Sequence, residues 1–130
     1  MYKIEKRPSG FLLTFGGFIE KEEMERWHSE SVDALHGAVP PFGVIIDMRA
    51  LQPLRPEVQG VMVEGQKKYM TAGMQRSCVI VANAITAAQF KRLARESGIY
   101  AFERYLDAEN TPDWTKPAVA WVKDGVDPDR

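Results

Sequence analysis

The chain has 130 residues, a length that suits one domain with a single core and leaves no room for two. Its 45% hydrophobic and 27% charged residues are typical of a folded globular protein and exclude the composition of a disordered chain. The formal net charge is only -1, so the protein lacks an overall positive field, and we expect no binding of nucleic acid.

The chain has one cysteine, Cys78, which lies in the apolar run 78–82 and therefore predicts a buried small side chain with no internal disulfide. The first seven residues lack the apolar region of a signal peptide. No segment approaches the ~20 apolar residues that span a membrane. We therefore expect a soluble, cytoplasmic protein that does not cross a membrane.

The first two predicted elements are strands. Tyr2, Ile4 and Lys6 alternate with Lys3 and Glu5, the pattern of a half-exposed strand at a sheet edge. A more apolar strand is predicted over residues 11–15, closed by two glycines. The turn over residues 8–10 joins these strands, so the chain is expected to open with an antiparallel hairpin.

The middle of the chain alternates helices with a buried strand. Residues 20–36 have apolar side chains at helical spacing and four acids in the first turns, where the helix dipole favours them. Residues 42–46 form an uninterrupted apolar run that stops at Asp47, which predicts a strand covered on both faces. Pro56 suits the first position of a second helix, which ends at Gly73. Its predicted buried face consists of Val58, Met62, Gly65 and Tyr69.

The last part of the chain continues this alternation. A buried strand over residues 77–82 precedes a third helix, which a capping box at residues 86–89 opens and Gly98 ends. The apolar face of that helix is expected to consist of Phe90, Leu93 and Ala94. A weaker strand over residues 101–106 and a final helix from residue 111 to Gly125 complete the single predicted domain, residues 1–125. An acidic tail, residues 126–130, follows.

The order of these elements predicts an α/β protein. Right-handed crossovers make the later strands parallel, so we expect a mixed, mostly parallel sheet of about five strands with about four helices and an N-terminal hairpin.

This order, together with three local phrases, resembles the SpoIIAA-like family of bacterial proteins. The phrases are residues 43–49, 73–76 and 95–104, and the resemblance runs over about the first 122 residues. The family is similar both to the STAS domain of anti-sigma factor antagonists and to the lipid-binding domain of CRAL-TRIO proteins. The resemblance therefore implies either a protein-binding switch or a small-molecule carrier.

The chain departs from the STAS antagonists at the residue that carries their switch. Those proteins have an Asp-Ser-Ser-Gly phrase at the start of the helix after the central strand, whereas this chain has Arg55-Pro56-Glu57-Val58 there, with Glu57 opposite the phosphorylated serine. No serine or threonine occurs from Met48 to Met70, so that helix start has no residue to phosphorylate. Glu57 could serve as a permanent negative charge, although the helix dipole alone explains an acid there.

Polar side chains are predicted to gather at the carboxyl ends of the parallel strands, where α/β proteins usually bind ligands. We expect Asp47, Arg49, Arg55 and Asn83 at this edge, and Arg104 is a further candidate. Arginines beside free helix N–H groups could hold a phosphate or a carboxylate. The structural alternative is that Asp47 and Asn83 cap turns and Arg49 pairs with Asp47.

The remaining sequence patterns give weaker indications of function. The two histidines lack the spacing of metal ligands, and no catalytic or nucleotide-binding phrase is present, so we expect no enzyme, metal or cofactor. Lys91, Arg92 and Arg95 could dock an acidic partner or a lipid headgroup, or simply form a solvated helix face. Exposure of Trp114 or Trp121 would favour a partner surface or a homodimer.

Two functional hypotheses follow. The first is a non-enzymatic interaction domain that binds an unknown protein partner through the second helix and adjoining loops, with Arg55 and Glu57 among its contacts. The second is a small-molecule or lipid carrier with Arg49 or Arg104 at the mouth of a pocket. Its soft lining would consist of Met62, Tyr69, Met70 and Met74.

Overall fold

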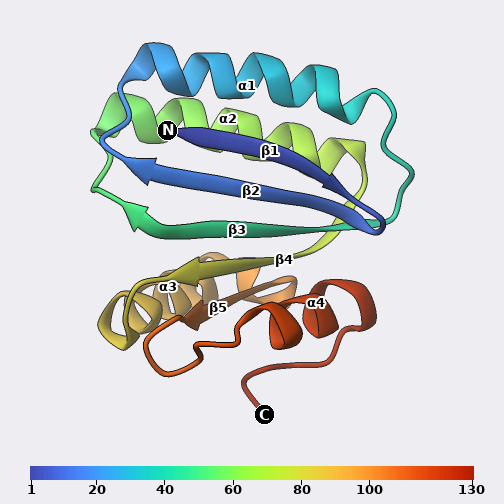
Figure 1. The fold of residues 1–130 in the computed structure, drawn as a ribbon, viewed down its shortest axis with the longest axis vertical. Coiled ribbons are helices and arrows are strands. Elements are labelled where there is room, and N and C mark those ends of the chain that lie inside the picture. Colours follow the sequence, from blue (N-terminus) through green and yellow to red (C-terminus); the bar gives the residue numbers. More distant parts are fainter.

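The five strands pair in chain order, β1-β2-β3-β4-β5, in a computed structural model that describes residues 1–130 (Figure 1). β1 and β2 are antiparallel, and the other three pairings are parallel. The predicted mixed, mostly parallel sheet with an N-terminal hairpin is therefore confirmed. The strands are β1 (Tyr2–Arg7), β2 (Gly10–Gly17), β3 (Phe42–Leu51), β4 (Met74–Val81) and β5 (Glu103–Asp107).

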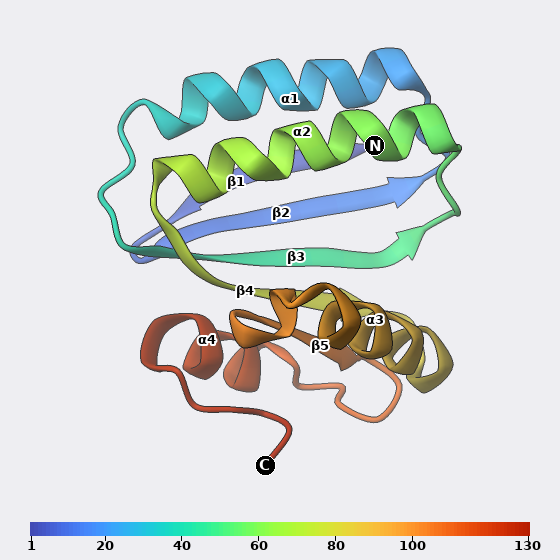
Figure 2. The same cartoon turned by 180° about the vertical axis from the view of Figure 1, so that it is seen from behind.

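The helices cover the two faces of the sheet unequally. They are α1 (Lys21–Leu35), α2 (Pro56–Ala72), α3 (Ala84–Ser97) and α4 (Thr115–Asp124), with a short 3-10 helix, η1 (Ile99–Ala101). Right-handed crossovers between strands that pair in chain order place α1, α2 and α3 on one face, as Figure 2 shows. α4 follows the last strand, so no crossover constrains it, and it packs on the opposite face against β3 and β4.

The larger core lies between the sheet and the first three helices. Trp27 of α1 is 1% exposed and fills its centre, in edge contact with Phe15 and stacked on Tyr69 of α2 at 6.1 Å between ring centroids. Gly65 faces the same ring, and a Cβ there would lie 2.5 Å from Trp27 Cη2. The absence of a side chain at Gly65 therefore allows α1 and α2 to approach closely. Tyr69 Oη donates to Ser31 Oγ at 2.8 Å, which joins the two helices inside the core.

The smaller core lies beneath α4. Val122 packs directly over Gly43 of β3, where a Cβ would lie 2.6 Å from the Val122 Cβ. The buried Trp121 donates its indole N–H to the Ser77 carbonyl at 2.9 Å. Since Gly43 leaves room for α4, the strand predicted to be covered on both faces has a helix on each.

Four expectations about the second half of the chain were wrong. Asn83, and not the predicted Thr86 box, caps α3, because Asn83 Oδ1, three residues earlier in the chain, accepts the Thr86 N–H at 2.9 Å. Leu93 is 54% exposed because it lies on the solvent side of α3. The last strand begins at Glu103 because η1 occupies residues 99–101, and α4 begins only at Thr115. None of the helices has the length and the apolar composition that a membrane crossing requires.

Candidate functional site

Asp47 and Arg49 form the centre of the predicted edge. They are two residues apart on β3, so their side chains lie on the same face of the sheet. Arg49 donates from Nε to Asp47 Oδ1 and from Nη2 to Asp47 Oδ2, both at 2.9 Å, and the Arg49 backbone N–H donates to Oδ1 at 3.1 Å. Both carboxylate oxygens of Asp47 therefore accept hydrogen bonds from Arg49.

This ion pair also connects the sheet to α4. The Arg49 guanidinium lies over the ring of Trp114, 5.0 Å from its centroid, and Trp114 is the N-cap residue of α4. The hydrogen bonds that Arg49 donates to Asp47 raise the pKa of Arg49 above its ordinary value, so the guanidinium stays charged. The sequence alternative in which Arg49 pairs with Asp47 therefore describes the observed geometry.

A surface hollow of about 720 Å³ opens beside this pair, at the carboxyl ends of β2 and β3. The register between these strands shifts after Thr14, which widens the edge where their chains separate. The hollow is lined by nine residues: Met1, Thr14, Phe15, Gly16, Gly17, Phe18, Asp47, Arg49 and Ala50. Its lining combines the Asp47–Arg49 ion pair with aromatic and glycine residues.

Phe18 lines the hollow and lies beside the start of α2, which carries two charged residues that form no ion pair. Phe18, in the loop after β2, is 46% exposed, and the Arg55 guanidinium lies 5.2 Å from the centroid of its ring. Arg55 is the N-cap residue of α2, and Glu57 lies in the first turn of that helix. Both charged side chains are exposed and neither takes part in an ion pair. We call Phe18, Arg55 and Glu57 the rim.

Asn83 and Arg104 lie away from this hollow. Asn83 follows β4 and uses its side chain to cap α3. Arg104 is near the amino end of β5, where it is stacked between Tyr100 and Trp121 and bonded to Asp127. Of the predicted site residues, Asp47 and Arg49 line the hollow, and Arg55 lies over Phe18, which also lines it; Glu57, Asn83 and Arg104 do not line the hollow.

Burial raises the pKa of several titratable groups that lie away from the hollow. Burial raises the pKa of the Cys78 thiol to about 12, and burial likewise raises the pKa of Tyr69 to about 12. Burial also raises the pKa of Glu103, whose carboxylate accepts a hydrogen bond from Tyr105 at 3.0 Å. None of these three groups lines the hollow, and no three His, Cys, Asp or Glu side chains come close enough to hold a metal ion.

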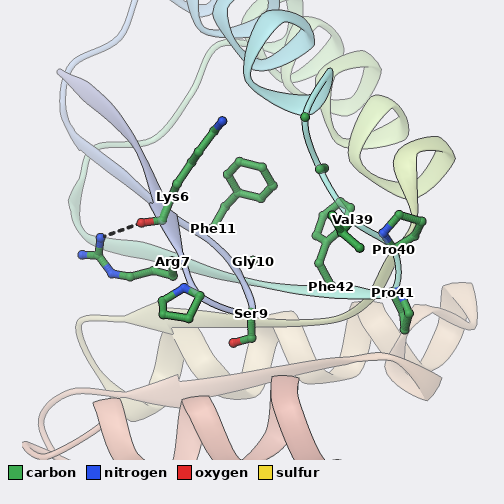
Figure 3. A pocket seen from close by; sticks show the side chains of 12 residues that line it. Lys6, Arg7, Ser9, Gly10, Phe11, Val39, Pro40, Pro41 and Phe42 are labelled. Atoms are coloured by element: carbon green, nitrogen blue, oxygen red, sulfur yellow. Dashed lines mark hydrogen bonds between the residues drawn. The ribbon is translucent and has the colours of Figure 1, made fainter.

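A second, smaller hollow of about 370 Å³ lies at the opposite edge of the sheet (Figure 3). The turn of the β1-β2 hairpin forms one wall with Lys6 and Arg7, and the loop before β3 forms the other with Pro40 and Pro41. The Arg7 guanidinium donates to the Lys6 carbonyl at 3.2 Å, so the Arg7 side chain turns back to its own strand.

Sequence reasoning missed Phe18, which lines the main hollow. Phe18 follows two glycines at the end of β2. Composition alone assigns aromatic residues to the core, whereas here Phe18 is exposed. The Gly16-Gly17 pair was a usable signal, because glycines at the end of a strand often mark a place where a ligand or another backbone approaches.

Comparison with known proteins supports the fold. Neither the known protein-family models nor the curated proteins include a match to the chain. An uncharacterized protein of the DUF3478 family from Shewanella loihica PV-4, which has a SpoIIAA-like fold, superposes with a TM-score of 0.64 at 18% identity. That match covers 94% of this chain and 92% of the other.

The Bacillus cell fate determinant SpoIIAA, in its phosphorylated form, superposes with a TM-score of 0.56 at 15% identity, over 88% of this chain and 99% of that chain. The chain therefore has a SpoIIAA-like fold, as the sequence resemblance implied. At these identities the likeness concerns the fold alone.

Proposed function

We propose that this chain is a non-enzymatic, STAS-like interaction domain that binds a partner protein through the rim and the adjoining hollow. The main support for the proposal is the rim itself. The Arg55 guanidinium lies over the exposed ring of Phe18, and Glu57, which forms no ion pair, lies two residues after Arg55 in α2. Aromatic and arginine side chains are the residues that contribute most to protein interfaces. The SpoIIAA-like fold supports an interaction role for the domain.

The start of α2 supports a partner contact that phosphorylation does not control. Its N-cap and first turn carry Arg55, Pro56 and Glu57, and the helix has no serine or threonine before Thr71. Glu57 places a fixed negative charge at a helix N-terminus, where the dipole stabilises it. We infer that the partner binds a constant charge pattern at this helix start, and that phosphorylation does not change that pattern.

Packing favours this proposal over the carrier alternative. The expected lining of a carrier does not face one space, because Met62 and Tyr69 lie in the core while Met70 is 50% exposed. The Trp27 ring fills the space between α1, α2 and the sheet. A carrier would have to separate these helices and expose the buried aromatic cluster, at a cost in apolar contact area.

Photo-crosslinking from the rim tests the proposal. A benzoylphenylalanine replaces Phe18 in one variant and Val119 in a matched control, because both positions are exposed and Val119 lies on α4, on the other face of the sheet. Irradiation in the cells that naturally make the protein should join a specific polypeptide to position 18 and not to position 119. The substitution Arg55→Glu in the Phe18 variant should remove that product without unfolding the protein, since Arg55 is exposed.

Two results would overturn the proposal. One is the same set of products from positions 18 and 119, and the other is a position-18 product that persists with Arg55→Glu. A product of twice the chain mass would identify the partner as a second copy of this protein, which is the homodimer alternative.

A further inference from the structure

The acidic segment, which comprises residues 126–130, occupies a basic and aromatic surface. In Figure 1 the last part of the ribbon turns back after α4 toward the C-terminal label. The surface beneath the segment is formed by α3, η1, β5 and α4. We call it the cradle and define it by five residues: Lys91, Arg95, Tyr100, Arg104 and Trp121.

Arg104 is the fixed centre of the cradle. Its side chain is 9% exposed, and its guanidinium lies 3.9 Å from the ring centroid of Tyr100 and 4.2 Å from that of Trp121. The carbonyls of Tyr100 and Glu103 accept hydrogen bonds from its Nη1. Its Nε and Nη2 donate to the two oxygens of Asp127 at 2.9 and 3.2 Å. Two rings and two backbone carbonyls therefore orient the guanidinium, which leaves one edge for a carboxylate.

A second carboxylate, that of Asp129, is held two residues further on. Lys91 Nζ donates to Asp129 Oδ1 at 3.0 Å, and the Tyr100 hydroxyl donates to Asp129 Oδ2. Arg95 Nη2 donates to the same Tyr100 hydroxyl at 3.2 Å, and its guanidinium lies over the Tyr100 ring at 4.4 Å. The cradle thus provides separate positions for two acids in the pattern Asp-x-Asp.

The carboxylates account for most of the attachment of the segment. Val126, its one large apolar side chain, is 58% exposed. Its backbone bonds to the rest of the fold are limited to the Val126 N–H, which donates to the Ala120 carbonyl at 3.1 Å. Arg104 lowers the pKa of Asp127 to about 2, so this carboxylate is ionised at neutral pH. A segment held by its charges and little packing can be displaced by another chain with the same charges.

We propose that the cradle is a binding site for an acidic Asp-x-Asp peptide of a partner protein, and that residues 126–130 are its built-in competitor. The cradle is separate from the rim: Arg104 lies near the amino end of β5, and none of its five residues lines the hollow at the carboxyl ends of β2 and β3. The inference therefore does not depend on the function proposed for the rim.

The test uses the full chain and a defined peptide probe. The probe is a fluorescently labelled acetyl-Val-Asp-Pro-Asp-Arg-amide, and the control peptide has asparagine in place of both aspartates. The protein is compared as wild type and as the double variant Asp127→Asn/Asp129→Asn, in which the competing carboxylates are absent. Binding is followed by fluorescence anisotropy at low salt.

The double variant should bind the probe at least about tenfold more tightly than the wild type, because a tethered segment competes at an effective concentration in the millimolar range. The control peptide should not bind. Adding Lys91→Glu to the double variant should abolish binding, whereas adding Lys116→Glu, at a side chain that is 86% exposed on α4, should leave it unchanged.

Equal affinities of the wild type and the double variant for the probe would overturn the proposal, as would equal binding of the two peptides. Loss of binding with Lys116→Glu as well as with Lys91→Glu would show that the probe responds only to the overall charge of the protein. That result would also overturn the proposal. If circular dichroism shows that the double variant is unfolded, Asp129→Asn alone frees Lys91 and Tyr100 while the Arg104–Asp127 pair remains. That variant should gain part of the affinity, and no gain would count against the cradle.

Discussion

Replacing Gly65 with alanine tests whether the α1–α2 interface is as tightly packed as the structure indicates. A Cβ at Gly65 would lie 2.5 Å from Trp27 Cη2 and closer still to Cζ3. The Trp27 ring cannot yield easily, because it contacts Phe15 on one side and stacks on Tyr69 on the other. Such overpacking costs typically about 1–3 kcal/mol, and we expect the upper end because the ring is confined.

Gly60 supplies the matched control, since it lies on the same helix, is exposed, and would place a Cβ in open space. Alanine gains about 1 kcal/mol over glycine in a helix interior, and both variants share this gain. Gly60→Ala should therefore stabilise the fold by up to about 1 kcal/mol, and Gly65→Ala should destabilise it by about 2 kcal/mol. Urea unfolding followed by tryptophan fluorescence measures both free energies. Equal stabilities of the two variants would refute the packing assigned to Trp27.

Three further outcomes are expected. Asn83→Ala should lower the free energy of unfolding by about 1 kcal/mol in urea titrations, because the Thr86 N–H loses its capping acceptor. Cys78 is 0% exposed and burial raises its pKa to about 12, so a thiol reagent should label it only after urea unfolds the protein; rapid labelling of the native state would contradict its burial. Arg104 lowers the pKa of Asp127 from 3.8 to about 2, so this carboxylate stabilises the fold above about pH 4, and its contribution is lost as the pH falls to about 2. The difference in melting temperature between the wild type and Asp127→Asn should therefore shrink over that range, and a constant difference would exclude this linkage.

Periodic patterns in the sequence predicted the parts of the fold that depend on local burial. The buried face expected for α2, Val58, Met62, Gly65 and Tyr69, is the one observed, because a 3.6-residue repeat places these positions on one side of the helix. The uninterrupted run before Asp47 became a strand with helices on both faces for the same kind of reason.

Contacts between distant elements could not be predicted in this way. The pairing of Arg104 with Asp127 depends on η1, which fixes where β5 begins, and on the return of the chain after α4. The side of the sheet that α4 covers has no local signal, since no crossover rule applies after the last strand. At the candidate site, the pairing of Arg49 with Asp47 was one of the two alternatives that the sequence offered, whereas the contact of the exposed Phe18 with Arg55 joins residues that are far apart in the chain.

Native mass spectrometry of the protein, purified by a tag from the cells that naturally make it, tests the central claim most directly. The wild type should carry a polypeptide that dissociates under denaturing conditions, and the Arg55→Glu variant, purified in the same way, should lack it while remaining folded. A polypeptide that is retained equally by both proteins would contradict the assignment of the rim as the docking surface. A bound species of small-molecule mass, with no polypeptide, would contradict the interaction domain itself and favour a carrier.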